Sequence, residues 1–205
     1  MKVELSVLNL PGASIEPENP LPLFRDRHPD GYSGKDDTLT EEEQTLLNYE
    51  ANFRILPYCM QDRYTREKKP MQLKTVILEN DKLKATFLCG YGAKLHSLVK
   101  KETGKEILFS NTVIQPGNLA IRNAWTSGGI EWNISQLGHS FTTCENIFMA
   151  KMTDKKLGEF VRVFEFERQK GLFWYIDFYL PEGSELLFAY VRIVNPNDTE
   201  SPMYW

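Results

Sequence analysis

Between residues 74 and 194 the chain is a succession of short apolar or alternating runs, each closed by residues that favour turns. The runs span 74–79, 83–89, 93–100, 106–109, 118–122, 145–152, 159–167, 172–180 and 186–194. Turn formers such as Asn80-Asp81 and Pro181-Glu182-Gly183 separate them. Short strands at this spacing are typical of antiparallel sandwiches and barrels. We therefore predict a mainly β fold whose antiparallel sheets pack on one another.

The first 73 residues follow a different pattern. Residues 3–8 alternate between apolar and polar side chains and predict a strand. Five prolines between residues 11 and 29 then exclude a long helix or a central strand, so we expect an extended wrapping arm. Thr40 followed by Glu43 predicts a capping box and one short helix near 40–54. We divide the chain into 1–73, with strand, arm and helix, and 74–205, with the β-sandwich.

Composition narrows the classes of function. The 205 residues include 41% hydrophobic side chains and carry a formal net charge of -4, so the chain is globular and lacks the positive field that nucleic acid binding needs. No apolar stretch has the length of a membrane span or a secretion signal, so we expect a cytoplasmic protein without a membrane partner. The three cysteines form no Cys-x-x-Cys pair, and phosphate-loop and zincin motifs are absent. We predict free thiols, no metal site and no cofactor.

A stretch from 118 to 141 has polar and aromatic residues without amphipathic order. It contains Arg122, Asn123, Trp125, Glu131, Trp132, Asn133, Gln136 and His139. Indole faces stack on the apolar face of a pyranose, while Arg, Asn, Gln and Glu side chains hydrogen-bond its hydroxyls. We therefore predict a carbohydrate site, with Arg122, Asn123, Trp125, Trp132, Gln136 and His96 as binding residues. Glu131 and His139 are the candidate catalytic pair, because both groups can transfer protons near neutral pH.

Structural roles remain open for most of these residues. Trp125 and Trp132 fit core packing equally well, and Arg122 could pair with Glu131 instead of a ligand. His139 also fits a hydrogen-bonded structural imidazole. His96 alternates with Leu95 in its strand, which predicts a surface or cleft position. Asp177 interrupts the apolar run 172–180, and a carboxylate in a buried strand needs a partner.

Two segments resemble a known superfamily. The sequence Gly-Ala-Lys-Leu-His-Ser-Leu at 92–98, followed by Thr103-Gly104-Lys105-Glu106, resembles the opening of galactose mutarotase-like (aldose 1-epimerase-like) domains. Ser-Gly-Gly-Ile-Glu-Trp-Asn at 127–133, then Gly138-His139 and Pro196-Asn197-Asp198, is similar to a narrower bacterial group. That group is the domain of unknown function that precedes tetratricopeptide repeats in long cytoplasmic proteins. The resemblance covers most of the chain.

The resemblance implies an antiparallel β-supersandwich whose concave face binds a sugar. Mutarotases of this superfamily use a His acid and a Glu base, with an Arg and an Asp for binding. Arg122-Asn123 is similar to the binding Arg-Asn pair, while the late Glu of the superfamily falls past Trp205 and only His139 offers a match to its His pair. The resemblance and the apolar end Tyr204-Trp205 lead us to expect a native chain that continues further.

Three functions follow as hypotheses. The first is a carbohydrate-binding domain of a larger glycan-related protein. The second is a sugar-active enzyme, an aldose epimerase or a glycoside-cleaving enzyme, that uses Glu131 and His139. The third is a structural or partner-docking domain, with an edge-strand dimer as one form of association, because the apolar C-terminal run would leave an unpaired sheet edge.

Overall fold

A computed structural model describes residues 1–15, 17, 19–24, 37–47, 55–118, 123–134, 139–201, 203 and 205. The strands are β1 (Lys2–Gly12), β2 (Asn19–Phe24), β3 (Ile55–Met60), β4 (Lys69–Glu79), β5 (Leu83–Leu88), β6 (Lys94–Lys100), β7 (Lys105–Glu106), β8 (Gly117–Asn118), β9 (Ala124–Trp125), β10 (Phe148–Asp154), β11 (Gly158–Glu167), β12 (Leu172–Tyr179) and β13 (Phe188–Val194). The helix described is α1 (Glu41–Leu47). The prediction of a mainly β, antiparallel fold is confirmed.

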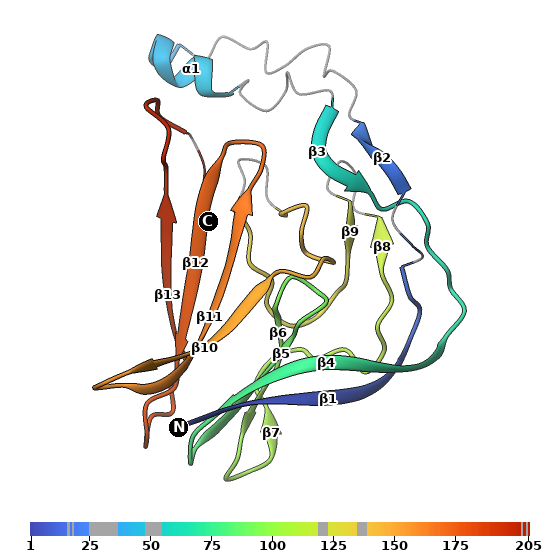
Figure 1. The fold of residues 1–205 in the computed structure, drawn as a ribbon, viewed down its shortest axis with the longest axis vertical. Helices are drawn as coiled ribbons and strands as arrows, with labels where there is room; N and C mark the ends of the chain where they lie inside the picture. The colour runs from blue at the N-terminus through green and yellow to red at the C-terminus, as the bar shows by residue number, and fades with distance from the viewer. Residues whose placement is uncertain are drawn as a thin grey trace.

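Two larger sheets make up the sandwich (Figure 1). The N-terminal sheet has the order β1-β4-β5-β6-β7, and the C-terminal sheet has the order β10-β11-β12-β13. All neighbours in both sheets are antiparallel. Two short ribbons, β2-β3 and β8-β9, lie beside them. Each strand of the C-terminal sheet is thus a hairpin neighbour of the next, as expected from the short turn sequences.

The main core lies between the two larger sheets. Leu78, Phe87 and Leu95 of the N-terminal sheet pack in one cluster with Trp174 and Phe178 of the C-terminal sheet. The Phe87 and Phe178 rings approach to 4.8 Å between centroids. Both rings are fully buried, and burial of such side chains stabilises the fold by roughly 1.5–3 kcal/mol each. Alternation along β4 and β12 therefore points one face of each strand into a shared core.

The first strand joins the two expected segments of the chain. β1 pairs with β4 along its whole length, from Lys2 opposite Glu79 to Gly12 opposite Lys69. The N-terminal sheet therefore draws on residues on both sides of position 74. The strand predicted over 3–8 is confirmed and runs on to Gly12.

The proline-rich arm contains a strand that the sequence did not predict. β2 pairs with β3, and its register shifts on both sides of Pro22. A proline lacks an N–H and is tolerated where a ladder is irregular. An irregular two-stranded ladder can therefore contain several prolines. The proline content of this segment alone indicated only an extended arm. Residues 25–36 of this arm lie outside the described residues.

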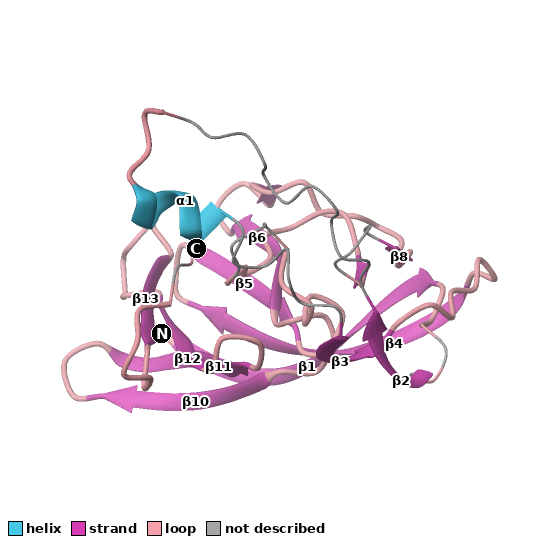
Figure 2. Cartoon of the chain, turned by 90° about the horizontal axis from the view of Figure 1, so that it is seen from above, coloured by secondary structure: helices cyan, strands magenta, loops and turns pink. Residues whose placement is uncertain are grey.

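The helix begins as the sequence predicts. The Glu43 N–H donates to Thr40 Oγ1 at 3.2 Å, and the Thr40 N–H donates to Glu43 Oε2 at 2.8 Å, which completes a capping box. α1 lies beyond the ends of the strands and outside both larger sheets (Figure 2). The predicted continuation to residue 54 falls on 48–54, which lie outside the described residues.

Two predicted runs are shorter as strands than expected. In the run 106–109 only Glu106 is in a strand, β7, because its carboxylate accepts the Leu98 and Leu108 N–H groups that a longer ladder would use. The run 145–152 enters β10 only at Phe148, after a turn in which the Glu145 N–H donates to Thr142 O at 3.1 Å. A third run, 118–122, has its first residue Asn118 in β8, and its residues 119–122 lie outside the described residues.

Candidate functional site

A tight turn brings the polar stretch against β6. The Leu95 and Ile130 backbones exchange two hydrogen bonds of 2.9 Å in an antiparallel bridge, which sets Glu131 beside Lys94. Gly129 precedes this bridge with φ +67°, and a Cβ there would lie 2.4 Å from Leu95 O. Only glycine fits this position, because any side chain would meet the backbone.

Glu131 and His139 lie together, as predicted. His139 Nδ1 and Glu131 Oε1 form an ion-pair contact, and the Asn133 amide donates to the same oxygen at 3.2 Å. The Glu131 side chain is 17% exposed and that of His139 is 37% exposed, so the pair sits at the protein surface. Glu131 Oε2 is buried and meets no hydrogen-bond donor within the described part of the chain.

Trp125 completes an aromatic side of this site. Its half-buried ring lies on β9, 5.9 Å from the His139 imidazole between centroids, with a tilt of 59° between the two planes. β9 pairs with β8, so Trp125 stands opposite Gly117. Glycine leaves the space beside the indole open, since a Cβ at Gly117 would lie 3.8 Å from Trp125 Nε1. We call Trp125, Glu131 and His139 the Glu131–His139 site.

A buried cation lies beneath the site. Lys94 is 3% exposed, and its Nζ donates to both the carbonyl and the hydroxyl oxygen of Thr126. Burial lowers the pKa of Lys94, and the Glu131 carboxylate acts in the opposite direction. The buried Lys94 ammonium therefore lies close enough to the Glu131 carboxylate to interact with its charge.

Two predicted binding residues have structural contacts instead of facing this site. The Trp132 indole N–H donates to Ala93 O at 2.9 Å, and its ring lies 4.9 Å from that of Phe178 in the main core. Asn123 is 2% exposed with φ 66°, and its amide oxygen accepts the Gln61 N–H at 2.7 Å. The Asn123 amide nitrogen donates to Cys59 O at 2.8 Å. Asn tolerates this left-handed conformation better than most residues, and here it ties β9 to β3.

His96 is buried, which corrects the expected surface or cleft position. It is 6% exposed, because the turn at Gly129 packs on its backbone and Ser110 lies 3.1 Å from its Nε2. Burial lowers the pKa of His96, and the nearby Glu106 carboxylate partly offsets that effect. The alternation of side chains along β6 gave the wrong exposure for His96, because both faces of β6 are covered at this point.

Arg122 and Gln136, two further predicted binding residues, lie outside the described residues.

The buried carboxylate in β12 has the partner that the sequence required. Arg162 of β11 donates from Nε and Nη2 to the two oxygens of Asp177, each at 2.6 Å. This bidentate pair lies on the outer face of the C-terminal sheet, away from the Glu131–His139 site.

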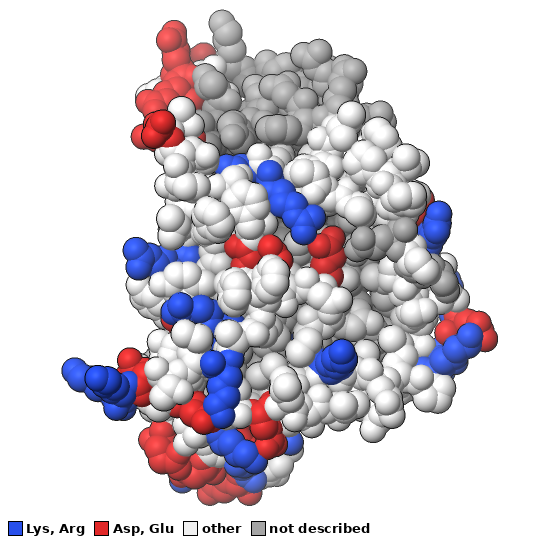
Figure 3. Space-filling view, viewed as in Figure 1, with Lys and Arg blue, Asp and Glu red and all other residues white. Residues whose placement is uncertain are grey.

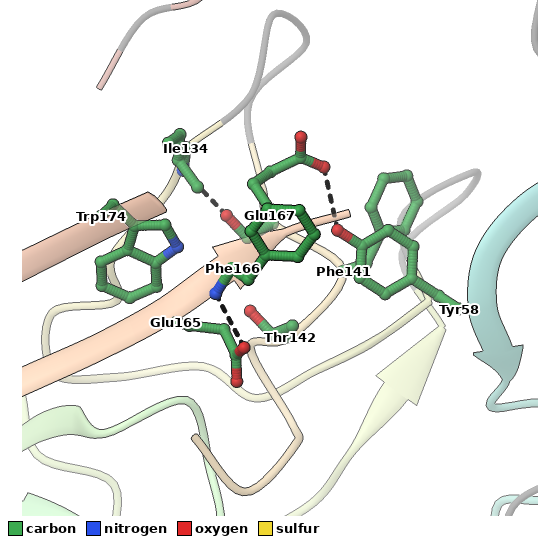
Figure 4. A pocket seen from close by; sticks show the side chains of 9 residues that line it. Tyr58, Ile134, Phe141, Thr142, Glu165, Phe166, Glu167 and Trp174 are labelled. Atoms are coloured by element: carbon green, nitrogen blue, oxygen red, sulfur yellow. Dashed lines mark hydrogen bonds between the residues drawn. The ribbon is translucent and has the colours of Figure 1, made fainter. Parts of the chain in front are cut away.

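Sequence reasoning missed a small pocket whose lining includes Ser140, the residue after His139 (Figure 4). It is lined by Tyr58, Ile134, Ser140, Phe141, Thr142, Glu165, Phe166, Glu167 and Trp174. These residues come from β3, β11, β12 and the segments 131–134 and 139–145, so no local motif unites them. The available signal was the pair Glu165 and Glu167, which interrupts the apolar run 159–167.

Charge is unevenly spread over the surface. On the face in Figure 3, side chains of both signs gather toward the end that carries the N-terminus, and much of the centre is uncharged. α1 adds three glutamates in its first turn, Glu41, Glu42 and Glu43.

Among the described residues, no group of three or more His, Cys, Asp or Glu side chains could hold a metal ion. No helix in this part of the chain is long and apolar enough to cross a membrane.

The fold and the site together define an antiparallel β-sandwich domain with an acid–imidazole–indole cluster beside β6. Residues 51–205 match the family described as domain of unknown function DUF5107, and the chain belongs to that family. Its structure is similar to the crystal structure of a TPR-domain containing protein from Parabacteroides distasonis, with a TM-score of 0.69 and 25% sequence identity. The match covers 96% of this chain and 29% of that protein, so this chain spans less than a third of the relative's length.

Proposed function

We propose that this domain binds carbohydrate at the Glu131–His139 site. The observation that carries the proposal is the Glu131 carboxylate, which contacts the His139 imidazole and keeps one oxygen without a donor among the described residues. The half-buried Trp125 ring lies beside this pair. Few other ligand classes combine hydroxyl donors with an apolar C–H face in one small ring.

The chemistry of each group fits a pyranose. The Glu131 carboxylate accepts a sugar hydroxyl, and His139 offers a ring nitrogen that donates or accepts according to its tautomer. Trp125 provides a face for the apolar side of the ring. Aromatic side chains combined with a few convergent polar groups are typical of small-ligand sites.

The wider resemblance supports the same ligand class. The segments at 92–98 and 127–133 resemble galactose mutarotase-like domains, a superfamily that binds sugars. The similar protein from Parabacteroides distasonis contains a TPR domain, and this chain matches only 29% of it. Both points support a carbohydrate-binding module that functions within a larger, glycan-related protein.

A second candidate function is a sugar-active enzyme, and the contact between Glu131 and His139 favours it. In mutarotation, one group would take the proton from the anomeric hydroxyl while the other protonates the ring oxygen, so that the ring C–O bond breaks. Re-closure on the other face would return both protons. A carboxylate and an imidazole in contact are suited to such a paired transfer.

Ligand-observed NMR against a panel of monosaccharides and oligosaccharides tests both functions at once. Saturation transfer that is lost in Trp125→Ala and retained in the off-site variant Tyr190→Ala is the expected result, since Tyr190 is exposed on the C-terminal sheet. Accelerated exchange of the anomeric signals that disappears in Glu131→Gln would establish the enzyme. Absence of transfer to every saccharide, or equal transfer in Trp125→Ala, would overturn the proposed site.

A further inference from the structure

β1 is a border strand of the N-terminal sheet, and alternate residues direct their backbone groups away from its neighbour β4. Val3 shows this direction, because its N–H donates to Glu159 Oε2 at 2.9 Å and its carbonyl oxygen accepts Lys151 Nζ at 3.3 Å. Pro11 has the same orientation, since its carbonyl oxygen accepts the Ile114 N–H at 3.0 Å. The N–H and C=O of one residue face the same side of an antiparallel ladder, and the side alternates along the strand. Every odd-numbered residue between these two therefore faces the open border.

Leu5, Val7 and Asn9 are the odd-numbered residues in this interval, and each directs one N–H and one C=O at the border. None of these groups has a hydrogen-bond partner among the residues that the structure describes. The contacts of β4 agree with this orientation. Lys74 stands opposite Val7, and its carbonyl oxygen accepts the Cys89 N–H at 3.0 Å on the other side of β4. The open part of β1 is thus about five residues, or roughly 17 Å, long.

Apolar side chains flank these open backbone groups. Leu5 is 84% exposed, and Val7 is also exposed. Lysines, prolines and bulges commonly protect free sheet edges, but residues 5–9 contain neither residue type and no register shift. The other borders of the two larger sheets differ, since β10 has Lys151 at its middle, β13 includes Arg192, and β7 has two residues. The edge at residues 5–9 is therefore suited to pair with a further extended chain.

The two ends of this open edge limit what can occupy it. A second copy of β1 centred on Val7 would place its Pro11 opposite Val3. The side chains bonded to Val3 already occupy that place, and the Ile114 backbone occupies the corresponding place beside Pro11. A second copy of this eleven-residue strand therefore meets an obstacle at each end. A short segment that enters and leaves between the two obstacles fits.

We propose that residues 5–9 of β1 bind an extended peptide segment of another protein chain as an additional strand of the N-terminal sheet. The bound segment has about five extended residues, with apolar side chains at alternate positions beside Leu5 and Val7. It has no proline at the positions whose N–H groups face β1, because proline has no such donor. Backbone hydrogen bonds supply affinity in this mode of recognition, and the alternate side chains supply specificity.

This peptide site is independent of carbohydrate binding. The Glu131–His139 site lies beside β6, and β4 and β5 separate β6 from β1. The two proposals can therefore fail separately, and Trp125→Ala should leave peptide binding unchanged.

Hydrogen exchange of single amides tests the open edge in the free protein. The amides of Leu5, Val7 and Asn9 should exchange at least roughly tenfold faster than those of Ser6 and Leu8, which face β4. This alternation is expected along one strand, so the neighbouring amides serve as internal controls. Equal protection of both sets would show that the edge is closed and would overturn the proposal.

A display library of random nine-residue peptides provides the probe. Synthetic copies of the selected peptide are then measured by fluorescence anisotropy and by hydrogen exchange. The expected peptide has alternating apolar residues and slows exchange of the Leu5, Val7 and Asn9 amides. Methylation of every second peptide nitrogen should abolish binding in one phase and preserve it in the other, since alternate N–H groups face β1. Failure to select a peptide, protection of β13 instead of β1, or an equal effect of both methylation phases would overturn the proposal.

Two variants at the centre of the edge measure its contribution. Val7→Pro removes an N–H that faces the border and is expected to weaken peptide binding roughly tenfold or more. Val7→Lys keeps the backbone and places a charge among the apolar contacts, so it decides the question if Val7→Pro does not fold. Val194→Lys is the matched control, because it adds the same charge to β13, the border strand of the other sheet.

Peptide affinity should fall in Val7→Lys and remain at the wild-type value in Val194→Lys. Equal affinities in these two variants would overturn the proposal. Sedimentation of the free protein tests the other occupant. A dimer that dissociates in Val7→Lys would assign the edge to a second copy of this chain and would overturn the peptide assignment.

Discussion

Asp177 on β12 receives two parallel hydrogen bonds from Arg162 on β11, each 2.6 Å long. The guanidinium also lies 4.2 Å above the Tyr175 ring centroid, so packing holds its plane in place. The Asp177 side chain is 4% exposed and that of Arg162 is 31% exposed. The hydrogen bonds and charge of Asp177 raise the pKa of Arg162. The carboxylate is therefore almost fully buried, and Arg162 is the counter-ion that it contacts.

Removal of one member of this pair is expected to destabilise the sandwich more than removal of both. Asp177→Leu leaves a partly buried guanidinium without its counter-ion, and we expect the free energy of unfolding to fall by about 2–4 kcal/mol. The double variant Arg162→Met, Asp177→Leu replaces both charges with apolar groups and should recover more than half of that loss. Urea unfolding of the three proteins measures the difference. A double variant that is less stable than Asp177→Leu would contradict this account.

The turn before Glu131 provides a second prediction. Gly104 and Gly129 have φ +68° and +67°, but a Cβ at Gly104 meets nothing within 4 Å, whereas one at Gly129 meets Leu95 O at 2.4 Å. Gly104→Ala should cost about 1–2 kcal/mol, the penalty of the left-handed backbone alone. Gly129→Ala should cost roughly 3 kcal/mol or more, because the Leu95–Ile130 bridge must open as well. Thermal unfolding compares the two variants, and equal losses would show that the bridge has no such constraint.

His96 is expected to make stability depend on pH. Burial lowers its pKa in the folded protein, while the unfolded side chain binds a proton near pH 6.5. Between the lowered folded value and about pH 6.5 the unfolded state holds more protons, so the free energy of unfolding falls as the pH falls through this window. Urea unfolding from pH 8 to pH 5 should show this loss in the wild type and a flatter profile in His96→Gln. Parallel profiles would exclude His96 as the source.

Cys144 is predicted to be an inert thiol in the folded protein. Burial raises its pKa to about 12, although the Lys94 ammonium acts against that shift. Thiolate is the reactive form, so alkylation of Cys144 near pH 8 should be at least roughly a hundredfold slower in the native protein than in urea. Peptide mapping after iodoacetamide treatment measures each cysteine separately. Equal labelling with and without urea would show that the site opens readily.

The sequence predicted the sandwich well where one local pattern decides the structure. The runs 159–167, 172–180 and 186–194 correspond to β11, β12 and β13, because hairpin strands need only alternation and a turn. β2 and β3 were missed, since β2 lies within the proline-rich arm and its partner β3 follows α1, far along the chain. Glu131 and His139 were chosen from one stretch of sequence, and the structure brings them into contact, while their catalytic role stays a prediction. The Trp174 pocket was not found, because its walls come from distant strands that only the tertiary fold unites.

The pairing of β1 with β4 has a consequence for how the protein is made. Val3 belongs to the main core, and its N–H donates to Glu159 Oε2, a residue 156 positions further along the chain. At the usual rate of about 5–20 residues per second, a ribosome needs roughly 10–30 s to reach Glu159 after Val3 has been added. β1 therefore leaves the ribosome well before Glu159 does, and this contact of Val3 forms only later. Its apolar side chains remain available to chaperones, and to other nascent chains, for most of that interval.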